Sequence, residues 1–148
     1  MAAQNHHGVL LVLGRNGVFI LGPSGSGKTR LMLTLLSHCR ALGIFARQVS
    51  DDQVLLERKG DRLIGTSPAA IAGLAEAYGH GPAAIGHEPR AVIDLVIRLV
   101  EPVEAPRFAE EDAVRIESVD LPCLVLAAGD AAGANLAICA RLGLPPFG

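Results

Sequence analysis

The feature that most constrains this chain is an eight-residue segment, residues 22–29, that separates a short apolar run from a segment with helical periodicity. It reads Gly-Pro-Ser-Gly-Ser-Gly-Lys-Thr and fits the phosphate-binding P-loop, in which four variable residues stand between a glycine and Gly-Lys-Ser/Thr. A strand before the loop and a helix after it form the setting that the motif requires. The residues predicted to bind a nucleotide are therefore Gly22, Pro23, Ser24, Gly25, Ser26, Gly27, Lys28 and Thr29.

Each residue type in this loop has a chemical role. Glycines let the backbone curl so that successive N–H groups point inward at the start of a helix and bind an anion. Lys28 supplies a mobile positive charge for the β- and γ-phosphates, and the hydroxyl of Thr29 can complete the coordination shell of Mg²⁺. The segment therefore predicts a site for ATP and Mg²⁺. The alternative is a Gly/Ser loop that only caps a helix.

Composition limits the classes of function. Half of the 148 residues are hydrophobic, which is enough for one domain, residues 1–148, with its own core. The net charge of −2 and the 3% of aromatic residues argue against a nucleic-acid partner. No basic region precedes the first apolar segment, and that segment is interrupted, so neither a signal peptide nor a membrane partner is expected. Three cysteines without metal-ligand spacing indicate reduced core residues of a cytoplasmic protein.

The hydrophobic pattern predicts an α/β fold. Asn16-Gly17 is a hairpin turn signal between two short apolar runs, and the helical pattern that follows the P-loop ends at Gly43. Strands are expected over 8–13, 18–21, 44–49, 53–57, 62–64, 91–100, 114–119 and 121–126. Helices are expected over 29–42, 68–75 and 134–142, and an irregular loop over 78–82.

Acidic residues at strand ends are candidates for chemistry beside the P-loop. Asp51 and Asp52 follow the strand after the P-loop helix, where such sites place a carboxylate that binds Mg²⁺ or acts as a general base. A solvated turn is an equally good interpretation of this pair. Asp94, within the long apolar run, is a weaker candidate for a Mg²⁺-binding carboxylate because few apolar residues precede it.

The order and spacing of these residues resemble the catalytic domain of the HPr kinase/phosphorylase family, in a short bacterial form without a separate N-terminal domain. The resemblance covers most of the chain. It implies a P-loop kinase-like α/β fold of the HPr kinase and phosphoenolpyruvate carboxykinase type, with a mixed sheet flanked by helices. The matching segments are His7-Gly8-Val9-Leu10, the P-loop, Asp51-Asp52-Gln53-Val54, Glu76 before a Gly-x-Gly loop, and Asn135-Leu136-Ala137.

The resemblance implies a role for the residues that bind nucleotide and metal. Lys28 matches the family's P-loop lysine on the β- and γ-phosphates, while Thr29 and Glu76 match the positions that hold Mg²⁺. Asp52 resembles the carboxylate that takes the proton from the substrate serine, with Asp51 as its neighbour. The segment before the two aspartates is longer than usual in the family, so the choice between them stays open.

Two basic residues are also matched. His7 is similar to the family's active-site histidine, although by itself it is more typical of a polar residue at a strand end. Arg107 resembles a catalytic arginine in surroundings that align loosely.

The activity that the resemblance implies is ATP- and Mg²⁺-dependent phosphorylation of a serine in an HPr-type phosphocarrier protein of the sugar phosphotransferase system. The family also implies a homo-oligomer, a hexamer. Tyr78 stands where the family has an arginine, and residues 127–135 lack the arginines associated with dephosphorylation, so the reverse reaction has less support. Two alternatives remain: a P-loop kinase or NTPase that acts on a small molecule, and an ATP-binding sensor module without catalysis.

Overall fold

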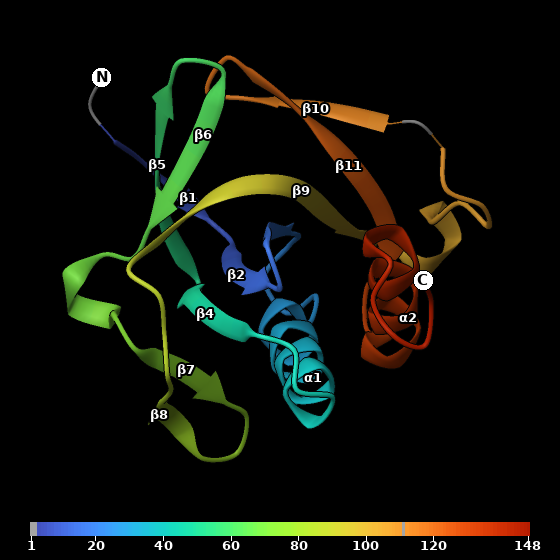
Figure 1. Ribbon diagram of the computed structural model, residues 1–148, viewed down its shortest axis with the longest axis horizontal. Coiled ribbons are helices and arrows are strands. Elements are labelled where there is room, and N and C mark those ends of the chain that lie inside the picture. The colour runs from blue at the N-terminus through green and yellow to red at the C-terminus, as the bar shows by residue number, and fades with distance from the viewer. Residues whose placement is uncertain (1–2, 111) are drawn as a thin grey trace.

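The computed structural model describes residues 3–110 and 112–148 as a curved mixed sheet with two helices side by side on one face (Figure 1). The predicted α/β fold is confirmed. The elements in chain order are β1 Gln4–His7, β2 Val9–Leu13, β3 Asn16–Leu21, α1 Lys28–Ala41, β4 Ala46–Ser50, β5 Gln53–Lys59, β6 Arg62–Thr66, the 3₁₀ turn η1 Ala69–Ile71, β7 Leu74–Ala77, β8 Gly81–Ala84, β9 Arg90–Val100, the 3₁₀ turn η2 Pro102–Glu104, β10 Asp112–Ile116, β11 Val119–Ala127 and α2 Ala131–Leu142.

The long strand β9 is the centre of the sheet. It runs parallel to β3 over residues 93–98 and parallel to β11 over residues 96–100. Its first residues, 90–92, pair instead with β6 in the antiparallel sense. Because β6 and β11 pair with successive parts of β9, the sheet divides into two branches, β6–β5–β1 and β11–β10, while β3, β2 and β4 continue on the other side.

Two hydrophobic cores lie on the two faces of this sheet. Successive side chains of a strand point to opposite faces, so β2 and β3 contribute to both cores. Val9 and Ile20 pack under the helices together with Leu35 of α1, whereas Leu10 and Phe19 pack between the two branches of the sheet. Burial on both faces is the reason these strands read as continuous apolar runs.

Most of the sequence-based element predictions are confirmed, since the β2–β3 and β5–β6 hairpins, α1, the long β9 and the closing helix are all present. The turn predicted at Asn16-Gly17 is displaced, because these two residues pair with β2 as the start of β3 and the chain reverses at residues 14 and 15. The helix predicted over 68–75 is wrong. Only a 3₁₀ turn forms there, and Gly73, with φ +74°, leads directly into strand β7, which carries Glu76. The loop predicted over 78–82 ends early because β8 begins at Gly81 and pairs with β7.

The strand predicted over 114–119 is interrupted by a turn. Glu117 and Ser118 adopt φ values of +47° and +64°, so the chain reverses there and β10 pairs with β11 as a hairpin. Positive φ at both central residues is the signature of a type I′ turn, usually made by Asn or Gly. The alternating pattern alone gave no sign of it. Among the described residues, no helix combines the length and apolar character needed to cross a membrane.

Candidate functional site

A cleft of about 1410 Å³ opens at the end of the sheet where β3 runs into the P-loop. Its walls come from the P-loop, the first turns of α1, the β7–β8 hairpin and the N-terminus of α2. Three residues singled out in the sequence, His7, Asp52 and Glu76, line the same cleft as Lys28 and Thr29. The fold therefore brings together five side chains that are up to 69 positions apart in the chain (7 to 76).

The P-loop has the curled backbone that its sequence predicts. Gly25 and Gly27 have φ values of +80° and +90°, and the N–H of Ser26 donates to the carbonyl of Pro23 at 3.1 Å. A side chain at Gly22 would place its Cβ 2.6 Å from Ser26 Oγ and 3.1 Å from Leu99 Cβ, so Ser26 would have to move to admit a larger residue. Helix α1 then begins at Lys28. The segment is thus a cradle of glycines that ends on a helix N-terminus.

Positive charge is concentrated at this cradle. Lys28 Nζ donates to the carbonyls of Gly22 and Pro23 at 2.9 and 3.1 Å, which places the ammonium group at the start of the loop. The N–H of Gly129 donates to the carbonyl of Ser26 at 3.3 Å and joins the loop to the residue before the N-cap of α2. Both helix N-termini therefore border the cleft. The N-terminus of α1 has no side-chain cap and no acidic residue in its first turn, so its dipole favours an anion there, whereas that of α2 is capped by the Asp130 carboxylate.

Asp51 connects the two residues predicted to hold Mg²⁺. One carboxylate oxygen accepts a hydrogen bond from Thr29 Oγ1 at 2.6 Å, and the other accepts from the backbone N–H of Glu76 at 2.9 Å. Asp51 is only 6% exposed, so these two bonds replace the water that a buried carboxylate has lost. The sequence analysis left open which of Asp51 and Asp52 acts in chemistry and assigned Asp51 no structural role. The structure makes it the link between the P-loop and β7.

Asp52 differs from Asp51 in every respect that matters for chemistry. It is exposed, lines the cleft, and its carboxylate makes no hydrogen bond within the described part of the chain. Its φ of +73° turns the backbone sharply at the strand end, and its carbonyl accepts from the N–H of Gly8 at 2.9 Å. His7, one residue before Gly8, is also exposed to the cleft and pairs with Gln53 between β1 and β5. His7 and Asp52 thus stand side by side at the rim.

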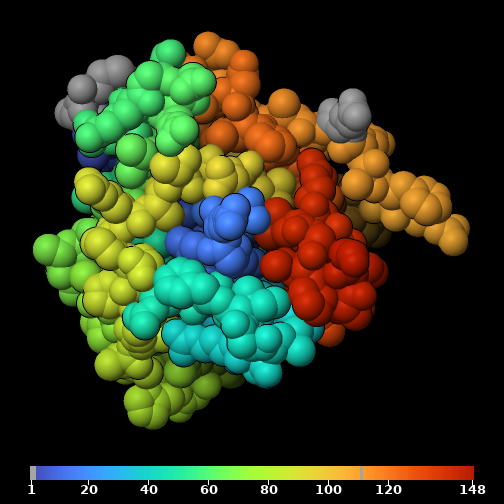
Figure 2. Space-filling model, viewed as in Figure 1, coloured from blue at the N-terminus to red at the C-terminus, as the bar shows by residue number. Residues whose placement is uncertain are grey.

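Two further candidates from the sequence are not in the cleft. Arg107 lies in the segment after β9, which projects from the body of the molecule in Figure 2, and its guanidinium lies 5.6 Å from the ring centroid of Phe108. Asp94 as a Mg²⁺-binding carboxylate is wrong, because its Oδ2 accepts from the N–H of Gly17 at 2.8 Å, at the end of β3 opposite to the P-loop.

Sequence reasoning missed one basic residue of the cleft, Arg30, which lines it from the first turn of α1. Its position immediately after Thr29 was the available signal. Within residues 3–110 and 112–148 no group of three or more His, Cys, Asp or Glu side chains is arranged to hold a metal ion. The oxygen donors that line the cleft and could hold a metal include the Thr29 hydroxyl and the carboxylates of Glu76 and Asp52, and oxygen is the ligand type that Mg²⁺ commonly has.

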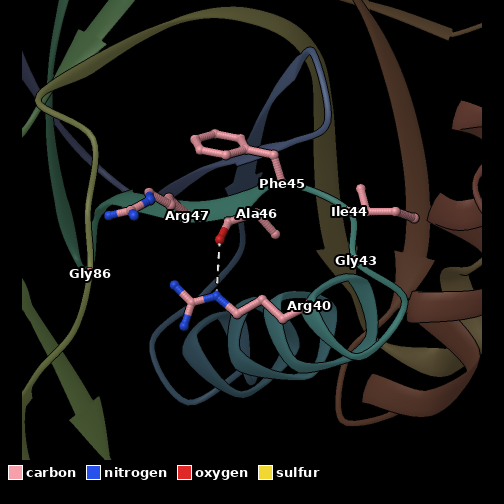
Figure 3. A pocket seen from close by; sticks show the side chains of 7 residues that line it. All are labelled: Arg40, Gly43, Ile44, Phe45, Ala46, Arg47 and Gly86. Atoms are coloured by element: carbon pink, nitrogen blue, oxygen red, sulfur yellow. Dashed lines mark hydrogen bonds between the residues drawn. The ribbon is translucent and has the colours of Figure 1, made fainter.

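A second hollow, of about 630 Å³, lies at the C-terminal end of α1 (Figure 3). Arg40 Nε donates to the carbonyl of Ala46 at 3.1 Å, while the Arg47 guanidinium lies 5.9 Å from the ring centroid of Phe45 and 3.9 Å from a carboxylate oxygen of Glu88. Since α1 has 14 residues, this hollow is about 20 Å from the P-loop. Its arginines serve local contacts and take no part in the cleft.

Comparison with known proteins identifies the family. The model of the family described as HPr Serine kinase C-terminal domain matches residues 1–117 of the chain. The chain belongs to this family. Among named members, the HPr kinase/phosphorylase of Neisseria meningitidis is 34% identical over 108 residues, which are 68% of this chain and 32% of that protein. That of Mycoplasma genitalium is 37% identical over 78 residues, 53% of this chain and 23% of that protein.

The chain thus spans about a third or less of the length of these HPr kinase/phosphorylase relatives. A solved structure, the Hpr(Ser) kinase/phosphatase from Coxiella burnetii, superposes with a TM-score of 0.76 at 24% identity and covers 91% of each chain. The likeness extends to nearly the whole HPr kinase domain described above. The family resemblance and the kinase-like α/β fold expected from the sequence are therefore both confirmed.

Proposed function

We propose that this HPr kinase domain is an ATP- and Mg²⁺-dependent protein serine kinase whose substrate is an HPr-type phosphocarrier protein. The observation that carries the proposal is the convergence of Lys28, Thr29, Glu76 and Asp52 on one cleft. Phosphoryl transfer needs positive charge around the non-bridging oxygens and an acceptor hydroxyl held in line with the leaving group. These four side chains have the chemistry for both tasks.

The P-loop is proposed to bind the triphosphate of ATP. Lys28 Nζ donates to the carbonyls of Gly22 and Pro23 and would donate to phosphate oxygens instead when ATP binds. This exchange should cost little, because the phosphates would bind along the same loop. Ser26 Oγ is buried and has no hydrogen-bond partner among the described residues, so it is free to form a hydrogen bond with a bound phosphate. When bound, Mg²⁺ would neutralise charge on the phosphates, and Thr29 Oγ1 and the Glu76 carboxylate would hold it.

Asp52 is proposed to be the general base. The serine oxygen of the substrate forms a bond to the γ-phosphorus, the bond from that phosphorus to the β,γ-bridging oxygen breaks, and ADP leaves with the bond's electrons. The proton of the serine hydroxyl goes to the Asp52 carboxylate, which is exposed and unpartnered among the described residues, unlike that of Asp51. His7 would stand beside the transferred group and bind its charge when protonated.

Several parts of the proposal rest on the family alone. These are a catalytic role for Arg107, assembly into a homo-hexamer and a cytoplasmic location. Arg107 does not line the cleft, so its participation would require the projecting segment to move or to serve a neighbouring copy. Sedimentation of the purified chain measures the assembly directly.

A second candidate function is an ATP-binding sensor that transfers nothing. Two features favour it. Tyr78, which is 94% exposed and lines the cleft, stands where the family has an arginine, and residues 127–135 contain no arginine or lysine. A third is transfer to a small molecule. The protein kinase, the sensor and the small-molecule kinase differ in which molecule receives the γ-phosphate of ATP, so one transfer assay distinguishes them.

The experiment uses γ-labelled ATP, Mg²⁺ and purified phosphocarrier protein with the wild type, Lys28→Ala and Asp52→Asn. We expect label on a serine with the wild type only, no nucleotide binding by Lys28→Ala, and nucleotide binding without transfer by Asp52→Asn. Equal transfer by Asp52→Asn removes that residue from the role of base. Binding without transfer by the wild type supports the sensor, and label in a metabolite supports a small-molecule kinase.

A further inference from the structure

The strand that carries Glu76 does not belong to the main sheet. Between the end of β6 and the start of β9 the chain leaves the sheet and forms the separate two-stranded β7–β8 sheet, which lies beside β4 (Figure 1). A hairpin of two strands is marginally stable by itself. The position of Glu76 relative to the P-loop therefore depends on what fastens this hairpin to β4.

Two buried polar side chains fasten it. Gln48, in β4, is 0% exposed, and its Nε2 donates to the carbonyl of Leu74 at 2.7 Å. Asp51, just past the end of β4, accepts from the N–H of Glu76 at 2.9 Å. Leu74 and Glu76 are two residues apart and so present these backbone groups on the same edge of β7. The side chains of Gln48 and Asp51 thus hydrogen-bond to backbone groups of β7 that a neighbouring strand would otherwise pair with.

Gln48 also fixes the other end of the same excursion. Its backbone carbonyl accepts from the N–H of Glu88 at 2.8 Å, and it forms a parallel β-bridge with His87. The backbone of Gln48 therefore holds the chain as it returns toward β9, while its side chain holds the chain as it enters β7. One residue of β4 anchors both sides of the hairpin.

The side chain of Gln48 is a poor choice for packing alone. Its Oε1 is buried and has no hydrogen-bond partner within the described residues, which destabilises the fold. Its neighbours along β4, Ala46 and Val49, are apolar and belong to the two hydrophobic cores. An apolar residue at position 48 would avoid the unpaired oxygen, but it would also release the Leu74 carbonyl.

We propose that Gln48 is a positioning residue for the metal site: its bond to Leu74 holds β7 so that Glu76 faces Thr29 across the cleft. This inference rests on the proposed role of Glu76 in binding Mg²⁺. Residues that orient a metal ligand without touching the metal typically contribute 10–100-fold to metal affinity. The loss should therefore appear in Mg²⁺ affinity and leave the P-loop's own affinity for nucleotide unchanged.

The chain contains its own reporter for this test. Tyr78 is its only tyrosine and it has no tryptophan, so tyrosine fluorescence comes entirely from a residue two positions after Glu76. Tyr78 is 94% exposed and lines the cleft. Titration with Mg²⁺ in the presence of a non-hydrolysable ATP analogue, followed by Tyr78 fluorescence anisotropy, measures the metal site without any turnover.

The key variant is Gln48→Met, which keeps the length of the side chain and removes the donor. Gln48→Asn, polar but too short to reach Leu74, serves if the methionine variant does not fold. The matched control is Val49→Ala, which creates a cavity on the opposite face of β4 without touching β7. We expect the half-saturating Mg²⁺ concentration to rise about 10-fold or more in Gln48→Met and to stay at the wild-type value in Val49→Ala.

Amide hydrogen exchange of residues 74–77 supplies the second readout, and it should become faster in Gln48→Met only. A wild-type Mg²⁺ response that Glu76→Gln abolishes and Gln48→Met leaves unchanged overturns the inference while the proposed metal site stands. Unchanged exchange of residues 74–77 in Gln48→Met overturns it as well. A wild type that shows no Mg²⁺ response instead overturns the proposed metal site itself.

Discussion

The hydroxyl of Thr29 donates a 2.6 Å hydrogen bond to Asp51 Oδ1, which ties the end of the P-loop motif to the end of strand β4. The other oxygen of the same carboxylate holds the N–H of Glu76. The adjacent Asp52 is exposed and faces the cleft. The two neighbouring aspartates thus differ in environment: Asp51 links Thr29 to β7, and Asp52 is exposed to the cleft.

This division predicts that the same substitution destabilises the fold at Asp51 and is nearly neutral at Asp52. Asp51→Asn replaces an acceptor with an amide that cannot accept from both Thr29 and Glu76, so we expect a loss of about 1–3 kcal/mol in the free energy of unfolding. Asp52→Asn should stay within about 0.5 kcal/mol of the wild type, since the site is exposed and asparagine tolerates positive φ. Urea unfolding measures both, and equal stabilities of the two variants would contradict the assignment.

Asp94 is predicted to contribute to stability and not to nucleotide binding. Asp94→Ala removes the acceptor for the Gly17 N–H, where the β2–β3 hairpin meets β9, and should cost about 1 kcal/mol. Asp61→Ala, in the exposed turn between β5 and β6, is the control and should be nearly neutral. Nucleotide affinity, measured by calorimetry, should be the same in both variants. A clear loss of affinity in Asp94→Ala would restore it as a candidate metal ligand.

Asp130 is predicted to matter as the N-cap of α2. Its carboxylate accepts from the N–H of Gly133 at 2.9 Å, so Asp130→Ala should lower the free energy of unfolding by about 1 kcal/mol, or the melting temperature by about 2–4 °C. Asp130→Ser keeps a capping oxygen and should restore most of the loss. Thermal unfolding of the two variants checks this, and a serine variant as unstable as the alanine variant would show that the cap is not the cause.

The cysteines are predicted to be unreactive in the folded protein. Burial raises the pKa of Cys39, Cys123 and Cys139 above the ordinary value of 9.0, so the thiolate is scarce near neutral pH. A thiol reagent should therefore label all three slowly in the native state and rapidly in urea. Rapid native labelling of any one of them would place it at the surface.

The same raised pKa values give a pH dependence of stability. The folded state keeps its thiol protons where the unfolded state has begun to lose them, so this contribution is present below pH 9.0 and is lost as the pH rises through the folded pKa values. Urea unfolding across this range should show falling stability. A variant with all three cysteines changed to alanine should fall less steeply, and equal slopes would exclude the thiols as the cause.

Local sequence signals were sufficient for the P-loop and for the helix that follows it. Gly25 and Gly27 of the P-loop have the positive φ angles that the motif predicts, and α1 begins within one residue of the predicted start. The predicted β2–β3 hairpin also forms, but its turn is at residues 14 and 15, with Gly14 at φ +61°, because Asn16 and Gly17 already pair with β2 as part of β3. Local signals gave a wrong prediction where contacts between segments determine the structure. Residues 68–75 read as a helix, but Gly73 and the pairing of β7 with β8 override the propensity of the alanines.

The sequence by itself determined the phosphate-binding loop, its helix and the family, because these depend on residue types at fixed short spacings. Only the tertiary structure decided that Asp51 holds Thr29 and Glu76 while Asp52 faces the cleft, that Gln48 fastens β7, and that Arg107 lies outside the site. The direction of a side chain at a strand end depends on which distant segments pack around it. The spacing of residues along the chain does not reveal how these distant segments pack.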